Sequence, residues 1–421
     1  MPFFRNPTSS FRKRNKKVPR TPYTTTKTMS SEIARLLDTQ PDPAARKGFE
    51  TEMSSFMQTF SRYQSNKEHG IELDWDKIRP PPAEQLIPYE SLKSEADLKG
   101  FSKLAILKVN GGLGTSMGMK GAKSALEVKN GLTFLDLTVQ QVQHLNTTMR
   151  TDKYVNHPVR ILTFNQSRYP RILKESLLPC PKHAEDESRA WYPLEYLFIS
   201  NSDNLGAIAD PVILQHMIES ESDFIMEVTN KTKSDLKGGT LVDYDGSLRL
   251  LELGQVPHEH VEDFKSVFNF KILNTNNLWV NLKALKRILD GEGMDLDIIE
   301  KTRYTDNGKG VIQLETAAGS AVKHFKQAHG IIVPRRRFIP VKNCADLLLV
   351  MSDIYRVENG HLVFNTHRPF QNTPTIKLSD DFKSIEQFHA RFKTIPSIAD
   401  LDLLTVTGDV YFGGSAIFEG L

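Results

Sequence analysis

A glycine-rich segment with two lysines is the part of this chain best suited to bind phosphates. Residues 107–124 read LKVNGGLGTSMGMKGAKS. Glycine adopts positive φ at little cost and lets a ligand approach the backbone, so successive N–H groups can surround a polyphosphate or a flat base. Lys120 and Lys123 add positive charge at the end of the loop. The segment predicts a nucleotide-phosphate site, and the alternative is a flexible turn between a strand and a helix.

Two familiar glycine motifs do not fit this segment. A P-loop ends in a Gly-Lys pair, whereas Lys123 follows Ala122. A dinucleotide fingerprint that starts at Gly112 needs its third glycine at position 117, which is Met117. A nicotinamide-dependent oxidoreductase is therefore disfavoured.

Short apolar runs alternate with helical patterns after about residue 100 and must position this loop. Strands are expected at 104–110, 159–164, 196–200, 223–229, 239–243, 247–253, 267–273 and 310–314. Helices are expected at 134–146, after Pro211, and at 281–289, 316–325 and 347–351. The alternation predicts an α/β fold with a doubly wound, mixed but mostly parallel sheet. Ligands of such sheets bind at the carboxyl ends of the strands, where the glycine-rich loop and Asp203 are both expected.

The composition excludes several classes of protein. The net charge of +3 comes from eight basic residues that precede Glu32, and the rest of the chain has a net charge of −5, which argues against a nucleic-acid surface. No apolar run has the length of a membrane span or the position of a secretory signal. Two cysteines provide neither a disulfide framework nor a thiolate metal site. We therefore expect a cytoplasmic protein without a membrane or nucleic-acid partner.

Three segments outside the α/β body have a distinct composition. Residues 1–31 are predicted to be a disordered basic tail, with a mitochondrial transit peptide as the alternative. Residues 32–100 are predicted to be a helical lead-in with a proline-rich linker around 80–82. Residues 396–421 resemble the first coil of a left-handed β-helix, which would be poorly stabilised without stacked neighbours.

The segment NGGLGTSMGMKGAKS resembles the nucleotide loop of eukaryotic, fungal-type UDP-glucose pyrophosphorylases, also called UTP–glucose-1-phosphate uridylyltransferases. Seven further blocks resemble the same family: TFLDLTVQQ from Thr133, FNQSRYPRI from Phe164, SNSDNLGA from Ser200, EVTNKTKSDLKGGTL from Glu227, LNTNNLW from Leu273, QLETAAG from Gln313 and RRRFIPVK from Arg335. The resemblance implies a nucleotide-diphospho-sugar transferase-like catalytic domain over residues 101–395.

The resemblance also implies an activity. Glucose 1-phosphate would attack the α-phosphorus of UTP with Mg²⁺ assistance, giving UDP-glucose and pyrophosphate. Positioning and charge neutralisation do most of the catalysis in transfers of this type. The product would serve carbohydrate metabolism in the cytoplasm, as a precursor of glycogen and cell-wall polysaccharides.

The residues that would carry this activity follow from the family motifs. Lys123 and Lys342 would be catalytic and would neutralise the phosphates from opposite sides, and Asp203 would bind Mg²⁺. The nucleotide-binding set is Val109, Asn110, Gly111, Gly112, Lys123, Gln166, Asp203 and Lys342. The substrate-binding set is Gly111, Gly112, Asn201, Ser202, Asp203, Asn276 and Glu315.

Residue types alone leave structural alternatives open. Without the resemblance, Asn201 and Asn276 could equally be structural residues of a turn or cap, Asp203 is more typical of a helix cap than of a metal ligand, and Lys342 is typical of a solvated surface. Arg335, Arg336 and Arg337 suggest either a phosphate clamp or a solvated charge run. Asp346 is expected on a helix face, and His324 and His329 are given no ligand role.

The chain also departs from the family pattern. A strand and helix expected after Arg150, and a Gly-His segment expected after Pro193, are missing. The second segment would contact uridine and sugar phosphate, so one alternative is a catalytically impaired or inactive variant that still binds nucleotide. Family members form homo-oligomers, and assembly is expected to be impaired where the C-terminal β-helix is incomplete.

Overall fold

The computed structural model describes residues 22–69, 73–93, 98–110, 114, 117–119, 121–151, 160–164, 194–232, 235–236, 238–291, 293–304, 307–368, 370, 372–414 and 418. The chain forms two compact units. One comprises Met1–Leu73 and Ile298–Glu315, and the other comprises Asp74–Asp297 and Thr316–Leu421. None of the helices in the described residues is long and apolar enough to cross a membrane.

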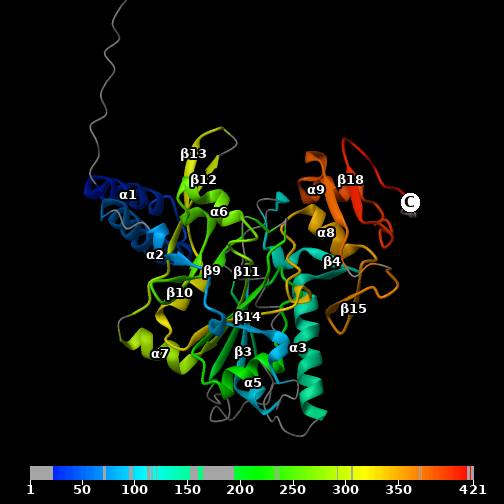
Figure 1. Ribbon diagram of the computed structural model, residues 1–421. Coiled ribbons are helices and arrows are strands. Elements are labelled where there is room, and N and C mark those ends of the chain that lie inside the picture. Colours follow the sequence, from blue (N-terminus) through cyan, green and yellow to red (C-terminus); the bar gives the residue numbers. More distant parts are fainter. Residues whose placement is uncertain are drawn as a thin grey trace, which may run out of the picture. The chain divides into compact units, whose positions relative to one another are not determined.

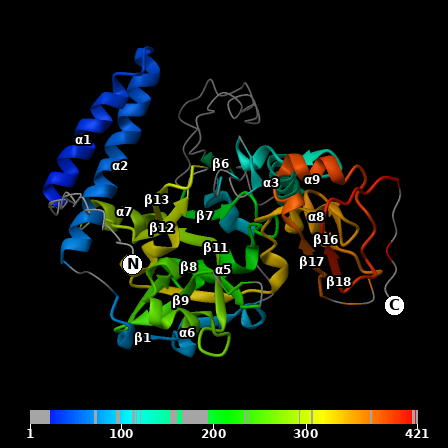
Figure 2. The same cartoon turned by 90° about the horizontal axis from the view of Figure 1, so that it is seen from above.

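The first unit joins two helices to a β-hairpin from much later in the sequence. Helices α1 (Pro22–Leu37) and α2 (Pro43–His69) lie side by side (Figure 2). Strands β12 (Ile298–Tyr304) and β13 (Gly310–Thr316) form the hairpin. Glu300 of β12 accepts a hydrogen bond from Tyr63 at 2.7 Å and pairs with Lys67 at 2.9 Å.

These elements differ from the expected boundaries. Residues 22–31 of the predicted disordered tail belong to α1, and residues 1–21 lie outside the described part of the chain. The β12–β13 hairpin lies within the range 101–395 but belongs to the unit of the helical lead-in. Contiguous ranges cannot describe a unit whose ion pairs join residues more than 200 positions apart.

The second unit is built on a seven-stranded sheet (Figure 1). Its strand order is β2 (Leu86–Pro88), β14 (Ala328–Ile332), β8 (Phe224–Asn230), β11 (Ile272–Asn281), β7 (Tyr196–Asn201), β3 (Leu104–Val109) and β6 (Arg160–Phe164). Strand β11 runs antiparallel to both neighbours, and the other described neighbours in this sheet are parallel. The predicted mixed, mostly parallel α/β sheet is confirmed.

The second unit differs from the sequence expectations at two places. The strand expected at 267–273 is β11, which runs from Ile272 to Asn281, because the polar stretch NTNN enters the sheet through a β-bulge between Asn274 and Asn277. The proline-rich segment around 80–82 is not a free linker. Before this segment, strand β1 (Ile78–Arg79) pairs with β9 (Thr240–Tyr244) in a separate three-stranded sheet, and after it β2 pairs with β14 in the seven-stranded sheet.

Both faces of the sheet are covered. On one face, α3 (Phe134–Thr151) and α5 (Pro211–Glu219) contribute Val142, Ile213, Leu214 and Met217 to a core with Ile106, Phe198 and Trp279. On the other face lie β9 (Thr240–Tyr244), β10 (Ser247–Leu251), α7 (Leu282–Asp290) and the 3-10 helix Ala318–His324. The short helix α6 (Val261–Lys265) lies between β10 and β11 in the sequence. The predicted hairpin turn is confirmed, since Asp245 and Gly246 both have positive φ.

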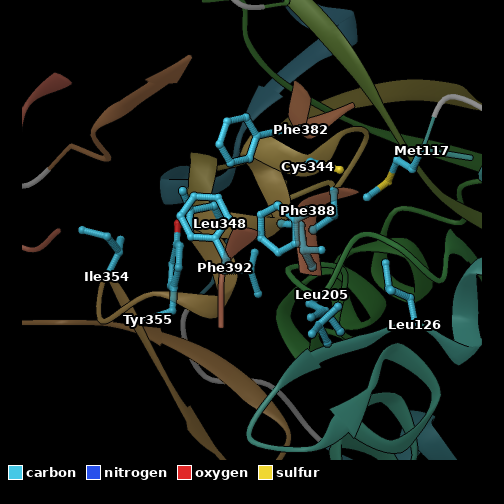
Figure 3. Close-up of a cluster of buried hydrophobic side chains, with 14 of the residues drawn as sticks. Met117, Leu126, Leu205, Cys344, Leu348, Ile354, Tyr355, Phe382, Phe388 and Phe392 are labelled. Atoms are coloured by element: carbon cyan, nitrogen blue, oxygen red, sulfur yellow. The ribbon is translucent and has the colours of Figure 1, made fainter. Parts of the chain in front are cut away.

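A third core lies beside the carboxyl ends of the strands. It contains α8 (Cys344–Met351), β15 (Tyr355–Glu358), β16 (His361–Phe364), β17 (Thr375–Leu378), α9 (Ile385–Arg391) and β18 (Leu403–Val406), next to β4 (Glu127–Lys129) and β5 (Leu132–Thr133). Leu348, Phe388 and Phe392 pack at its centre, and Met117 and Leu205 join it (Figure 3).

The expected start of a β-helix is not confirmed by the described residues of the C-terminal segment. β18 pairs in parallel with β17, and Leu404 and Val406 are buried in the third core. Within the described residues, this segment therefore contributes side chains to a core that it shares with α8 and α9.

A pair of histidines predicts acid sensitivity of the folded state. Nε2 of His216 on α5 lies 3.1 Å from Nε2 of His329 on β14, so one neutral ring donates to the other. Burial and the neighbouring His216 lower the pKa of His329 to about 4, and burial also lowers the pKa of His216. The neutral forms stabilise the fold above about pH 6.5, and this contribution is lost as the pH falls toward 4.

We expect about 2–3 kcal/mol of stability to be lost over this interval through the His329 shift. The measurement is Tm against pH for the wild type and for His329→Gln, whose amide keeps a donor and an acceptor but does not titrate. His389→Gln, at an exposed position on α9, is the matched control. The Tm advantage of His329→Gln over the wild type should grow as the pH falls from 6.5 to 4. Parallel curves would contradict the assignment.

Candidate functional site

The site begins where two neighbouring parallel strands end. Val109 of β3 pairs with Asn201 of β7, and the N–H of Ser202 donates to the Val109 carbonyl at 2.8 Å. The side-chain oxygen of Asn110 then accepts from the Ser124 N–H at 3.1 Å and from the Ser202 hydroxyl at 3.2 Å. Asn110 therefore holds the exit of the glycine-rich loop against the loop that follows β7.

Lys123 and Asp203 form a buried ion pair at this edge. The ammonium of Lys123 lies 2.7 Å from Oδ2 of Asp203, and the two side chains are 6% and 10% exposed. Lys123 begins a short 3-10 turn after Ala122, and Asp203 lies two residues beyond the end of β7. Because water is largely excluded, this cation and anion interact more strongly than a surface pair. The structure therefore brings together two residues that are 80 positions apart.

The glycine-rich loop is described only in part. Gly114 and Gly118 have φ near +65°, and the Gly114 carbonyl accepts from the N–H groups of Met117 and Met119. A Cβ on Gly114 would lie 2.7 Å from the Met119 sulfur, so this position requires glycine for space as well as for its dihedral angles. Of the predicted site residues, Gly111, Gly112 and Gln166 lie outside the described residues, as does Lys120.

Lys342 is held next to the same ion pair. The Val341 N–H donates to the Asp203 carbonyl at 3.1 Å, and the Lys342 N–H donates to Oδ2 of Asp346 at 2.8 Å. Burial raises the pKa of Asp346, while the positive charges of Lys342 and Lys123 act in the opposite direction. Asp346 is thus a first-turn cap of α8 that faces both lysines. The Lys342 side chain is exposed, and its ammonium lies 5.5 Å from the centroid of the Phe338 ring. The site therefore combines the buried Lys123–Asp203 pair with Asp346 and an exposed lysine.

Two predicted sugar-facing residues lie in different surroundings. Asn276 lies in the bulge of β11 with φ +58°, and it exchanges hydrogen bonds with Asn274 at 2.8 and 2.9 Å. It is neither a helix cap nor part of a surface turn. Glu315 lies on β13 of the other compact unit, where its carboxylate pairs with Lys301.

The three consecutive arginines do not act together. Arg335 makes a two-point ion pair with Asp235 at 2.6 and 3.1 Å, and Arg336 is exposed. Arg337 is buried and binds both oxygens of Glu227, with its Nη1 3.1 Å from Asp210. The segment is therefore neither a phosphate clamp nor a solvated charge run, because two of its cations have carboxylate partners within the fold.

Sequence reasoning missed the buried pairing of Arg337 with Glu227 and the buried lysine Lys108. Arg337 and Glu227 join β8 to the loop that carries Lys342, and no local pattern marks them as partners. Lys108 of β3 donates to the Ala207 carbonyl at 2.6 Å, and burial together with the charge of Arg337 lowers its pKa to about 7. A lysine within the apolar strand LAILKV was the available signal, because charged residues are rare in buried strands. His324 and His329 have protein partners, Asp295 and His216.

The oxygen atoms that the protein offers here suit a metal ion that is held mainly by the phosphate oxygens of a bound substrate. Within the described ranges, no group of three or more His, Cys, Asp or Glu side chains is arranged to hold a metal ion. Asp203 offers carboxylate oxygens beside Lys123 at the carboxyl end of β7. Mg²⁺ is commonly held by one or two carboxylates, substrate phosphates and water. One carboxylate beside the predicted phosphate site fits that pattern.

Comparisons with known proteins agree on one family. The family model described as UTP--glucose-1-phosphate uridylyltransferase matches residues 53–152, 146–194 and 194–418. A Schizosaccharomyces pombe protein named probable UTP--glucose-1-phosphate uridylyltransferase is 45% identical and covers 93% of this chain and 87% of its own length. The Saccharomyces cerevisiae UTP--glucose-1-phosphate uridylyltransferase is 44% identical, with coverage of 93% and 88%.

Solved structures with the same fold carry related names. The UDP-glucose phosphorylase of Trypanosoma brucei has a TM-score of 0.71 and 27% identity over 87% of this chain and 95% of its own. A mutant UDP-glucose pyrophosphorylase of Leishmania major, in complex with UDP-glucose, has a TM-score of 0.70 and 31% identity over 89% and 92%.

The alignments also locate the departures from the family. The three matched stretches meet at 146–152 and at 194, next to the two junctions where segments are missing from the sequence. The alignment with the S. pombe protein extends over 441 positions, although it covers 93% of a chain of 421 residues. The relative therefore has internal residues where this chain has gaps.

Proposed function

The chain belongs to the UTP–glucose-1-phosphate uridylyltransferase family, and we propose that the site around Lys123, Asp203 and Lys342 performs the family's reaction. A phosphate oxygen of glucose 1-phosphate attacks the α-phosphorus of UTP in line with the leaving group. The bond from the α-phosphorus to the bridging oxygen breaks, and pyrophosphate leaves. The observation that carries this proposal is the buried Lys123–Asp203 pair at the exit of the glycine-rich loop.

Each charged residue has a distinct role in this proposal. Lys123 stabilises the negative charge that develops on the phosphates, and a cation in a water-poor site does so without reorganisation. Lys342 approaches the same phosphates from the segment that follows Pro340. In the free protein Asp203 holds Lys123 in place, and phosphate oxygens compete with this carboxylate when nucleotide binds.

A divalent ion is proposed for the same position. Asp203 would hold Mg²⁺ together with the nucleotide phosphates, and the ion would neutralise part of the phosphate charge. We also propose that the enzyme is cytoplasmic and supplies UDP-glucose for glycogen and cell-wall polysaccharides. The low cysteine content fits a reducing compartment, and the names of the fungal relatives support only the synthesis of UDP-glucose.

The test of the reaction is direct. The full chain is incubated with UTP, glucose 1-phosphate and Mg²⁺, and both pyrophosphate release and UDP-glucose are measured. We expect the two products in equal amounts, with slower turnover when another nucleoside triphosphate replaces UTP. The absence of UDP-glucose would contradict the proposal.

The second candidate is a catalytically impaired member of the family that still binds nucleotide. The gaps at 146–152 and 194 favour it, because the missing Gly-His segment would contact uridine and sugar phosphate. The assay is repeated with the S. pombe relative under identical conditions. Turnover equal to that of the relative would contradict impairment, whereas UTP binding without turnover would support it.

Asp203→Asn tests the proposed metal role. The change keeps the shape of the side chain but removes its charge, so we expect the half-saturating Mg²⁺ concentration of the reaction to rise by at least ~10-fold. Asp245→Asn is the matched control, because its position in the β9–β10 turn has positive φ, which asparagine accepts. An unchanged Mg²⁺ titration for Asp203→Asn would contradict the metal role.

A further inference from the structure

The loop that carries Asp203 and the segment that carries Lys342 are in close backbone contact. Asn204 forms an isolated antiparallel bridge with Pro340, and the Val341 N–H donates to the Asp203 carbonyl. A Cβ on Gly206 would lie 2.5 Å from the Arg336 carbonyl oxygen, a distance that side chains do not tolerate. The two segments are therefore packed too closely for any residue other than glycine at position 206.

One side chain joins these segments with its full hydrogen-bonding capacity. Asn204 is 1% exposed. Its Oδ1 accepts from the N–H groups of Gly206, at 3.2 Å, and Ile339, at 2.8 Å. Its Nδ2 donates to the Arg337 carbonyl at 3.2 Å and to Oδ1 of Asn277 at 3.3 Å. An amide has two donor hydrogens and two acceptor positions, and all four are used here.

The partners of Asn204 are themselves fixed to the sheet. Nδ2 of Asn277 donates to Oε2 of Glu227 at 3.0 Å. The guanidinium of Arg337 binds both oxygens of the same carboxylate, at 2.8 and 2.6 Å. Trp279 donates to Oε1 at 2.9 Å. Strands β8 and β11 therefore hold a rigid network against which Asn204 fixes residues 337–341.

We propose that Asn204 is a positioning residue for the transfer, because it sets the place of Lys342 relative to Lys123 and Asp203. This inference rests on the proposed function, in which both lysines neutralise the phosphates. Asn204 does not need to touch substrate for this role. A displacement of about 1 Å in a charged group can cost about 100-fold in rate.

Asn204→Asp is the informative variant. The oxygen that replaces Nδ2 faces the Arg337 carbonyl and Oδ1 of Asn277, so two hydrogen bonds become repulsive contacts, while the bonds from Gly206 and Ile339 remain. The folded fraction of each variant is measured by near-UV circular dichroism, and kcat is given per folded molecule. We expect this kcat to fall about 10- to 100-fold with little change in the KM for UTP. An unchanged kcat would overturn the inference.

A double-mutant cycle separates positioning from simple destabilisation. Lys342→Met alone is expected to lower kcat, and adding Asn204→Asp should then cost much less than it does in the wild type. If Asn204→Asp lowers kcat by the same factor in the wild type and in Lys342→Met, the inference is overturned and the role of Lys342 is unaffected. No effect of Lys342→Met would overturn the role of Lys342 and the inference together.

The pH dependence gives a readout that a structural defect would not produce. A buried carboxyl has a raised pKa, and its protonated form again donates toward the Arg337 carbonyl. The ratio of kcat for Asn204→Asp to kcat for the wild type should therefore rise as the pH falls, and a constant ratio would count against positioning. Met217→Ala, a core change on α5, is the control that lowers Tm but leaves kcat per folded molecule unchanged.

A second variant covers the case in which Asn204→Asp does not fold. Gly206→Ala adds a Cβ 2.5 Å from the Arg336 carbonyl oxygen and pushes the same segments apart. Gly206→Ala is tested in the same double-mutant cycle with Lys342→Met. A loss of kcat that disappears in the Lys342→Met background supports the inference, and a loss that persists overturns it.

Discussion

Lys123→Met is expected to lower kcat by about 10²- to 10³-fold, which is typical for the loss of one preorganised group that stabilises transition-state charge. The ammonium of Lys123 is buried at the exit of the glycine-rich loop, where its side chain is only 6% exposed. Methionine has a similar length but no charge. The measurement is pyrophosphate release at saturating UTP and glucose 1-phosphate, with kcat/KM for both substrates. We expect kcat and kcat/KM to fall together, because the interaction is strongest in the transition state.

A second buried lysine provides the control for this prediction. Lys129 of β4 donates to the carbonyls of Met351 and Ser352 at the end of α8, and it has no proposed role at the phosphates. Lys129→Met also removes a buried ammonium and should lower Tm, but kcat of the folded enzyme should be unchanged. An unchanged kcat for Lys123→Met, or an equal loss in both variants, would contradict the role of Lys123.

Arg337→Met is expected to lower the free energy of unfolding by about 3–5 kcal/mol, because it leaves buried carboxylates without their cation. Glu227 has 0% side-chain exposure, and Asp210 has 10%. Asp210 also caps α5 and accepts from Tyr89, so the defect extends to the first turn of that helix. The measurement is urea unfolding followed by tryptophan fluorescence, since the Trp279 indole donates to Glu227.

Two further variants test the cause of this loss. Arg356→Met removes an exposed pair with Glu358, in which both side chains are half exposed, and should cost less than about 1 kcal/mol. Arg337→Met combined with Glu227→Gln should be less destabilised than the sum of the two single variants, because no unpaired charge remains on Glu227. If Arg337→Met lowers the free energy of unfolding by no more than Arg356→Met does, the buried ion pairs of Arg337 are not a major source of stability.

Strands with a continuous apolar pattern could be predicted from the sequence. The expected ranges for β3, β6, β7 and β8 differ from the structure by one residue at each end or less. Strand β11 was misplaced because Asn274 and Asn277 resemble a turn in sequence but are buried in the sheet. Their amides are satisfied by Asn276 and Glu227, and only the fold brings Glu227 to Asn277.

In the candidate site, too, some residues could be predicted from motifs and others only from the fold. The glycine-rich loop predicted a phosphate site, and the motifs named Lys123, Asp203 and Lys342. The structure places these three residues at one edge of the sheet. Asn204 lies within a motif that was noticed, but its role depends on Ile339, Arg337 and Asn277, which are more than 70 residues away.

The sequence by itself predicted the α/β class and a phosphate-binding segment, because apolar periodicity and glycine spacing are local properties of the chain, and the family followed from the resemblance of its motifs. The tertiary structure decided which charged residues are buried and which atoms satisfy them. Arg337 follows two exposed arginines, Arg335 and Arg336, yet its own guanidinium lies between Glu227 and Asp210. The cost of burying a charge depends on partners that only folding brings within hydrogen-bonding distance, so this part of the site could not be read from the chain alone.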